Sequence, residues 1–103
     1  MKKPIKVFLE YKIKNEYKKE YEALIPKILK ENQSYDAIDV DWFEAVDQNN
    51  LYVEMFEIPT MDHYYAVKKD REDKDHPIFG KLDECIDGGL KKLHCWAFIH
   101  KNI

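Results

Sequence analysis

Residues 5–14 read IKVFLEYKIK, a stretch in which an apolar side chain occupies every second position. This period of two is typical of a β-strand with one buried face, because successive side chains of a strand point to opposite sides of the sheet. Apolar residues recur in a similar way in residues 38–46, 51–58 and 93–100, so the sequence predicts four strands. Residues 47–50 supply turn chemistry and are expected to join the second and third strands as a hairpin.

A first helix is predicted between the first two strands. Asn15 is a suitable N-cap, and apolar residues recur at three- and four-residue spacing from Tyr17 to Leu29. Pro26 lies inside this stripe and is expected to bend the helix, because proline cannot donate a backbone hydrogen bond.

A second, broken helix is predicted after the third strand. Thr60 can cap a helix over residues 61–71, and the almost fully charged run 68–75 is expected to be a solvated helix end and loop. Helical spacing resumes after His76-Pro77 and ends at Gly88-Gly89. The order strand, helix, strand, strand, broken helix, strand predicts an α+β fold: a ferredoxin-like βαββαβ arrangement whose antiparallel sheet carries its helices on one face. Residues 1–103 are too few for two independent cores, so a single domain is expected.

Charge and cysteine usage argue against several classes of partner. The chain carries 17 Lys and Arg against 20 Asp and Glu, with the signs alternating along it. Without a basic stripe or a polybasic anchor, neither nucleic acid nor a membrane is expected as a partner. Charged residues interrupt the apolar run that a signal peptide would need, so a cytoplasmic location is expected. Cys85, Cys95 and the histidines lack metal-ligand spacing, so no metal site is expected and both cysteines are expected to be reduced.

The face of the sheet that the helices leave uncovered, called the open face below, is expected to be aromatic. Assignment of alternate positions by polarity places on it Phe8, Glu10, Tyr52, Glu54, Phe56, His94, Trp96 and Phe98. The second strand is ambiguous, because both of its residue sets mix apolar and acidic side chains. Monomers rarely expose so large an apolar patch, so we expect a homodimer through the open face. Its aromatic interior would form a pocket for a small organic ligand.

Within such a pocket the polar residues are the catalytic candidates. Burial raises the pKa of a carboxyl group, so Glu10 and Glu54 are expected to act as acid or base, with His94 beside them. Two alternatives stay open. The two carboxylates could pair with Lys6 or Lys12 at the rim, and the aromatic side chains suit a dry dimer interface as well as a pocket.

Several short motifs resemble those of a known superfamily. They are Glu16-Tyr17, Pro26, Asp47 through Asn50-Leu51, Glu57-Ile58 and Ala66-Val67. With this strand and helix order they resemble the dimeric α/β-barrel superfamily over essentially the whole chain, and in layout the L-rhamnose mutarotases. That resemblance implies a catalytic role for Tyr17, places Tyr21 where the family has a histidine, and places Trp42 at the aromatic position of the second strand.

The resemblance leaves three functions open, none requiring a cofactor. The first is a mutarotase-like enzyme that uses general acid-base chemistry on a small sugar. The second is an enzyme similar to the antibiotic-biosynthesis-type monooxygenases of the same superfamily, which oxidise aromatic substrates without a cofactor. The related heme-degrading branch has a histidine in roughly the region of His76, but His76 before Pro77 fits a helix cap better than an iron ligand. The third is a non-catalytic, ligand-binding or stress-related dimer. The ligand-binding candidates are Phe8, Tyr21, Trp42, Tyr52, Phe56, Trp96 and Phe98.

Overall fold

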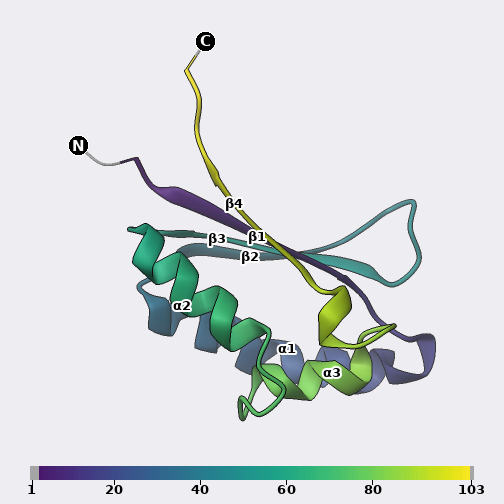
Figure 1. Ribbon diagram of the computed structural model, residues 1–103. Helices are drawn as coiled ribbons and strands as arrows, with labels where there is room; N and C mark the ends of the chain where they lie inside the picture. Colours follow the sequence, from purple (N-terminus) through teal and green to yellow (C-terminus); the bar gives the residue numbers. More distant parts are fainter. Residues whose placement is uncertain (1–2, 103) are drawn as a thin grey trace.

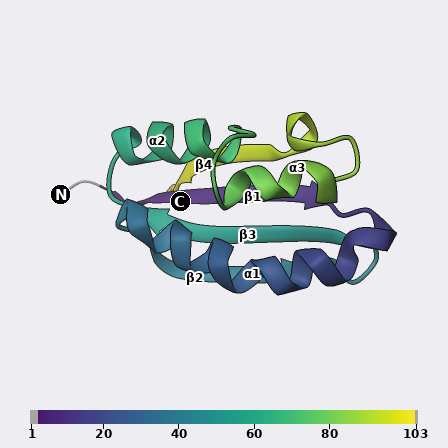
Figure 2. The same cartoon turned by 90° about the horizontal axis from the view of Figure 1, so that it is seen from below.

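A computed structural model describes residues 3–102 and has the predicted order of elements. The strands and helices are β1 (Ile5–Lys12), α1 (Lys18–Asn32), β2 (Ile38–Glu44), β3 (Leu51–Ile58), α2 (Met61–Arg71), α3 (Leu82–Cys85) and β4 (His94–Ile99). The strands form a four-stranded sheet in the order β2-β3-β1-β4, with every neighbouring pair antiparallel. All three helices lie on one face of this sheet (Figures 1 and 2). The predicted α+β, ferredoxin-like fold is therefore confirmed.

The two long helices begin in different ways. Thr60 caps α2 as predicted: its hydroxyl accepts a hydrogen bond from the backbone N–H of His63 at 3.3 Å. Asn15 does not cap α1. A 3-10 turn precedes that helix, and the Asn15 side chain accepts a hydrogen bond from the Asn50 amide at 3.4 Å. The start of α1 is thereby linked to the hairpin between β2 and β3.

The second helix is broken, and its continuation is shorter than the sequence predicts. His76 Nδ1 accepts hydrogen bonds from the backbone N–H groups of Ile78 at 3.2 Å and Phe79 at 3.1 Å, so the predicted capping role of His76 is confirmed. Only one α-helical turn, α3, follows among the described residues. It ends at Cys85, because Ile86 is extended and pairs with Ile13, so the predicted helix end at Gly88-Gly89 is wrong.

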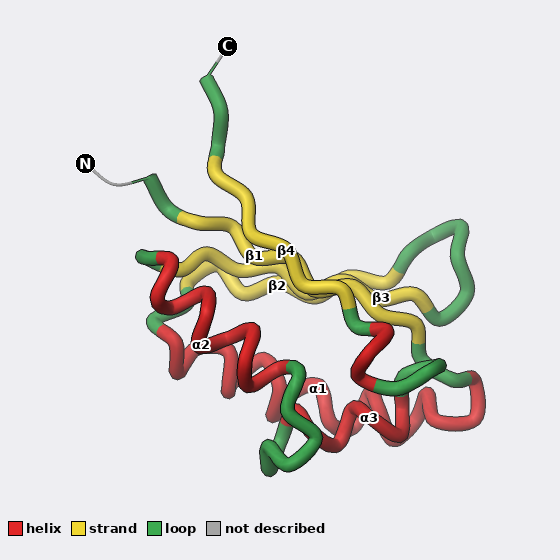
Figure 3. Tube along the Cα trace, viewed as in Figure 1, coloured by secondary structure: helices red, strands yellow, loops and turns green. Residues whose placement is uncertain are grey.

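The strands β1 and β4 follow their predicted faces. In β1 the residues Ile5, Val7, Leu9 and Tyr11 are buried beneath the helices, as expected. In β4, Trp96 and Phe98 lie on the open face with 46% and 50% of their surface exposed, also as expected. In Figure 3 the helices, drawn in red, all lie on the other side of the yellow strands, which leaves the open face uncovered.

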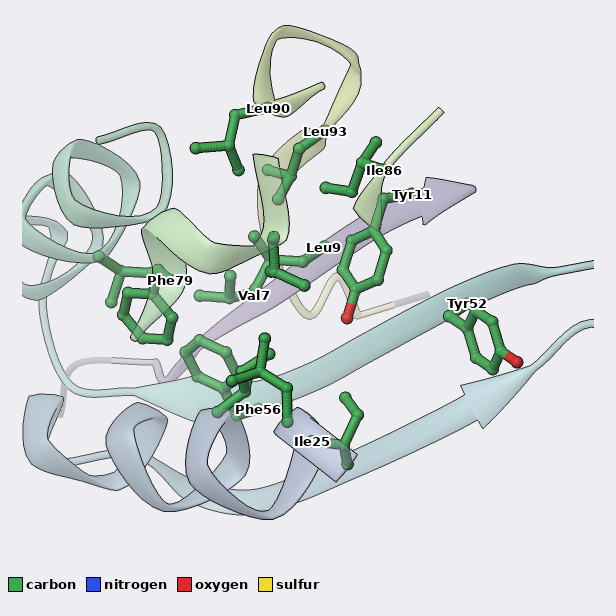
Figure 4. Close-up of a cluster of buried hydrophobic side chains, with 14 of the residues drawn as sticks. Val7, Leu9, Tyr11, Ile25, Tyr52, Phe56, Phe79, Ile86, Leu90 and Leu93 are labelled. Atoms are coloured by element: carbon green, nitrogen blue, oxygen red, sulfur yellow. The ribbon is translucent and has the colours of Figure 1, made fainter. Parts of the chain in front are cut away.

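The predicted face of β3 is wrong. Tyr52, Glu54 and Phe56 are buried against the helices, and Figure 4 shows Tyr52 and Phe56 among the core side chains. The strand register explains this, since Leu9 pairs with Glu54 and Phe8 pairs with Met55. The open face of β3 instead carries Leu51, Val53, Met55 and Glu57.

No helix among residues 3–102 is long and apolar enough to cross a membrane.

Candidate functional site

The predicted site residues separate into two sets on opposite faces of the sheet. Between the sheet and the helices lie Tyr21, Trp42, Tyr52, Glu54 and Phe56. On the open face lie Phe8, Glu10, His94, Trp96 and Phe98. The two carboxylates expected to work together, Glu10 and Glu54, are thus separated by the sheet.

A fully buried ion pair forms the centre of the interior set. The two terminal nitrogens of the Arg71 guanidinium donate to Glu54, Nη1 at 2.8 Å and Nη2 at 2.7 Å, whereas Nε has no partner among the described residues, and neither side chain is exposed. The Asn32 amide donates to the same carboxylate at 2.8 Å and accepts from Arg71 at 3.0 Å. The guanidinium also lies 4.3 Å from the centre of the Phe79 ring. These contacts offset the cost of removing both charged groups from water.

A chain of hydrogen bonds runs from this ion pair toward β2. Tyr11 donates to Glu54, the hydroxyls of Tyr11 and Tyr21 are 2.8 Å apart, and the Trp42 indole N–H donates to Tyr21 at 2.7 Å. Each hydroxyl has one proton, and the ionised carboxylate can only accept. Because Tyr11 uses its proton on Glu54, Tyr21 must donate to Tyr11. The chain therefore has a single direction, from Trp42 to Glu54.

The protonation states follow from this pairing. Burial alone would raise the pKa of Glu54, but the charge of Arg71 and the hydrogen bonds from Arg71, Tyr11 and Asn32 outweigh it, and the net shift lowers that pKa. Burial, followed by the charge of Glu54, raises the pKa of Tyr11 well above its ordinary value, and burial also raises that of Tyr21. The expected raised pKa of Glu54 is therefore wrong. Glu54 is a fixed anion, and the two tyrosines remain protonated.

Three aromatic rings form the outer part of the interior set. The rings of Trp42 and Tyr52 are nearly parallel at 12° with centroids 5.7 Å apart, and Tyr21 lies 4.7 Å from Tyr52. Trp42 is half-buried, whereas Tyr52 is 1% exposed. The Tyr52 hydroxyl is buried and has no hydrogen-bond partner among the described residues. Figure 4 shows it pointing away from the rest of the core cluster. We call Tyr11, Tyr21, Asn32, Trp42, Tyr52, Glu54 and Arg71 the interior cluster.

An ion pair lies at the outer end of Tyr52. Glu44 is the cross-strand partner of Tyr52 on β2, and its carboxylate lies 3.3 Å from the Lys18 ammonium on α1. Lys18 also borders a surface hollow of about 680 Å³, which is lined by Lys12, Ile13, Lys14, Asn15, Glu16, Lys18, Asn49, Asn50 and Asp87.

Three members of the interior cluster were not predicted. Arg71 lies in the charged run expected to be solvated, and that expectation is wrong for this residue. Spacing could have indicated both Arg71 and Asn32, because Tyr64, Val67 and Arg71 follow a single helical stripe. Asn32 likewise extends the stripe of Tyr21, Ile25 and Ile28 by four residues. Tyr11 was recognised only as a buried strand residue.

The open-face set is more loosely organised. Glu10 and His94 are cross-strand partners and line one hollow of about 240 Å³, beside Lys12, Asp87 and Lys92. The His94 ring stacks on Trp96 at 5.4 Å, and Phe8 meets Phe98 edge-to-face at 5.2 Å. At the rim, Lys6 pairs with Glu57 at 3.8 Å instead of with Glu10 or Glu54.

Tyr17 joins neither set. It is half-buried at the start of α1 with the Lys14 ammonium 5.1 Å from its ring centre. None of the hydrogen bonds in residues 3–102 connects its side chain to Glu10, Glu54 or His94. No group of three or more His, Cys, Asp or Glu side chains within this same range is placed to hold a metal ion.

Comparisons with known proteins identify the fold. No protein-family model matches the sequence, and no curated protein matches it. Among solved structures, a conserved protein from Methanosarcina mazei Go1 is 20% identical with a TM-score of 0.74, covering 96% of this chain and 94% of its own. An antibiotic biosynthesis monooxygenase is 12% identical with a TM-score of 0.74, over 95% of this chain and 99% of its own. Rv0793 from Mycobacterium tuberculosis is 11% identical with a TM-score of 0.70, over 97% of both chains. The chain thus shares its ferredoxin-like fold with the antibiotic biosynthesis monooxygenase.

Proposed function

We propose that the protein is an enzyme of the antibiotic-biosynthesis-monooxygenase type that oxidises a small aromatic compound at the interior cluster. The observation that carries the proposal is the group of Tyr21, Trp42 and Tyr52 rings next to a buried, hydrogen-bonded polar network. Aromatic faces with a few fixed polar groups are the usual composition of a site for a flat organic ligand. The fold shared with a monooxygenase supports the reaction class.

The reaction needs no external reductant when the substrate supplies all the electrons. A phenol with a free para position can react with one O2 to give a quinone and one water. The phenol loses its hydroxyl proton and the hydrogen of the oxidised carbon. One oxygen atom becomes the new carbonyl oxygen, and the other leaves as water. Four electrons pass from the substrate to O2, so atoms and electrons balance.

The protein's contribution in this scheme is positioning. Glu54 is held as an anion by Arg71, and Tyr11 and Tyr21 keep their protons, so the network does not act as a base at neutral pH. Instead it fixes the Tyr21 ring, which packs against Tyr52. A group fixed in this way holds a bound ring in one orientation and lowers the entropic part of the barrier.

Entry to the cluster is proposed at Trp42. This residue is half-buried on β2, an edge strand whose register against β3 shifts between Ile38 and Asp41. An outward movement of its ring would expose the faces of Tyr21 and Tyr52. Strand ends and edges with irregular pairing are where local opening costs least.

We further propose that the protein is a homodimer through the open face. Phe43, Trp96 and Phe98 are each about half exposed there, at 46%, 46% and 50%. Exposed aromatic side chains gathered on one face of a sheet are typical of a protein–protein interface. Its polar residues have both signs, since Lys6 and Glu57 lie at the rim, so a two-fold axis can pair the face with itself.

A mutarotase is less well supported because its acid-base residues are not gathered. Glu54 lies under the helices, bound to Arg71, whereas Glu10 and His94 lie on the open face. No proton donor and acceptor from the predicted set therefore face one ligand on the interior side.

The test is oxygen consumption by the purified full chain with a panel of para-unsubstituted phenols and naphthols. We expect uptake of one O2 per quinone formed, with no oxygen returned on addition of catalase, because the second oxygen atom leaves as water. Trp42→Ala should abolish turnover. Tyr65→Phe, which alters an exposed tyrosine of α2, is the matched control and should retain it.

Binding is followed separately in a Trp96→Phe background, where Trp42 is the only tryptophan. Quenching of Trp42 fluorescence without oxygen uptake would show a binding protein and contradict the enzymatic proposal. Neither quenching nor uptake across the panel would remove the interior cluster as a ligand site.

A further inference from the structure

We propose that the Tyr52 hydroxyl, together with the Lys18 ammonium, binds an ionised oxygen of the ligand, so that the protein binds phenols as phenolates. This inference rests on the proposed function, because it names the chemical form of the ligand at the same interior cluster. It assigns a ligand contact to Tyr52 and an electrostatic role to Lys18.

The first argument is the unused donor on Tyr52. The side chain is 1% exposed, yet its hydroxyl has no partner among the described residues. Among the described residues the only other buried side-chain nitrogen or oxygen without a partner is Nε of Arg71, whereas Tyr11, Tyr21 and the Trp42 indole all donate within the cluster. A buried polar group without a partner costs free energy, and natural proteins retain few of them. A ligand oxygen that accepts from Tyr52 would remove this cost.

The second argument is the charge at the outer end of Tyr52. Lys18 lies at the first position of α1 and reaches Glu44, the cross-strand partner of Tyr52. Burial, and next the charge of Glu44, raises the pKa of Tyr52, whereas the Lys18 ammonium lowers it through its charge and as a donor toward the Tyr52 oxygen. Tyr52 therefore stays a proton donor at neutral pH. An anionic ligand oxygen can take the place of the Glu44 carboxylate as the partner of Lys18.

The third argument is access. Lys18, whose charge acts on Tyr52, also lines the hollow of about 680 Å³ beside the start of α1. The Lys18–Glu44 pair is exposed, and exposed ion pairs contribute little to stability, so it can open at small cost. A ligand that takes the place of the displaced Trp42 ring against Tyr52 would then meet a hydroxyl donor, a cation and a route to water at one point.

A nitrophenol tests the inference directly, because its anion is yellow and its neutral form is not. Absorbance titrations at a series of pH values give the pKa of the bound nitrophenol. We expect the bound pKa to be at least one unit below the free value, equivalent to a tenfold or greater preference for the anion. The nitrophenyl methyl ether, which cannot ionise, should bind at least tenfold more weakly than the nitrophenolate.

Variants then assign the effect to residues. Tyr52→Phe and Lys18→Gln should each bring the bound pKa back toward the free value, whereas Glu44→Gln should lower it further by removing a competing anion. Tyr65→Phe should leave it unchanged, and circular dichroism checks that each variant is folded. A bound pKa equal to the free value in the unaltered protein, or one that Tyr52→Phe and Lys18→Gln leave in place, would overturn the inference.

The inference and the proposed function fail in distinguishable ways. Nitrophenolate binding that depends on Tyr52, without oxygen uptake from any phenol, would refute the oxidase activity and keep the site. Oxygen uptake that persists in Tyr52→Phe, with the bound pKa unshifted, would refute the site and keep the activity.

Discussion

Replacing Tyr52 by phenylalanine is expected to stabilise the free protein, although it removes a buried polar group. The hydroxyl is buried, and its proton is donated to none of the described residues, so its removal leaves no acceptor unsatisfied. An unsatisfied buried group costs about 1–3 kcal/mol. Taking the lower end, because the rest of the ring stays in place, we expect Tyr52→Phe to raise the free energy of unfolding by about 1 kcal/mol.

Tyr21→Phe is the matched comparison, because its hydroxyl lies in the same cluster but is fully paired. It accepts from Trp42 and donates to Tyr11, and each such hydrogen bond contributes about 1 kcal/mol. Its loss should lower the free energy of unfolding by about 2 kcal/mol. Tyr65→Phe, on the surface of α2, should change it by less than about 0.5 kcal/mol.

Urea unfolding followed by circular dichroism measures all three variants. The slope of free energy against urea should stay constant, so that midpoint shifts report stability. Protein concentration must be equal throughout, because dimerisation contributes to the apparent stability. If Tyr52→Phe destabilises the protein as much as Tyr21→Phe does, the Tyr52 hydroxyl has a partner and the argument for a ligand contact there fails.

Three further predictions follow from the same structure. Arg71→Met should lower the free energy of unfolding, measured by urea unfolding, by about 3–5 kcal/mol, because it leaves the Glu54 carboxylate buried and unpaired. The double variant Glu54→Leu with Arg71→Met should recover most of that loss. No recovery in the double variant would contradict the pairing. The folded-state pKa of Glu54 is lowered from its ordinary value of 4.5, so its contribution to stability is present above that value and is lost as pH falls through the lower folded pKa. Thermal unfolding between pH 6 and pH 2 should therefore show a flatter acid limb in Glu54→Gln, and parallel curves would count against this origin. Phe98→Glu should convert the proposed dimer to a monomer in light scattering, whereas the same charge at exposed Tyr65 should leave the mass unchanged; a monomeric unaltered protein would refute the interface.

The fold could be predicted from alternation because most strand residues follow one rule. In β1 the apolar residues at alternate positions, Ile5, Val7, Leu9 and Tyr11, face the helices, so polarity and burial agree for this set. In β3 polarity and burial disagree at Glu54. This residue is charged but buried, because Arg71, 17 residues later in the chain, neutralises it. Polarity patterns contain no information on such a distant partner. The set Leu51, Val53 and Met55 therefore has the composition of a core face while it lies on the open face.

The site could be predicted only in part for the same reason. Tyr21 and Trp42 were expected as ligand-binding residues, and they do lie together with Tyr52. Arg71 was not expected, because it is surrounded in sequence by solvated charges. Its burial depends on where α2 ends over the sheet, which is a property of the packed structure and not of the local sequence.

The Glu54 carboxylate has a consequence for how the chain chooses one arrangement over its closest competitor. Turning β3 over would bury Leu51, Val53 and Met55, which are as apolar as the residues that they would replace. In that alternative the guanidinium of Arg71 would be buried without a counter-ion, and the Asn32 amide would lose its hydrogen-bond acceptor. Glu54, which is hydrogen-bonded to both long helices, thus destabilises the reversed orientation of β3 far more than apolar packing alone could.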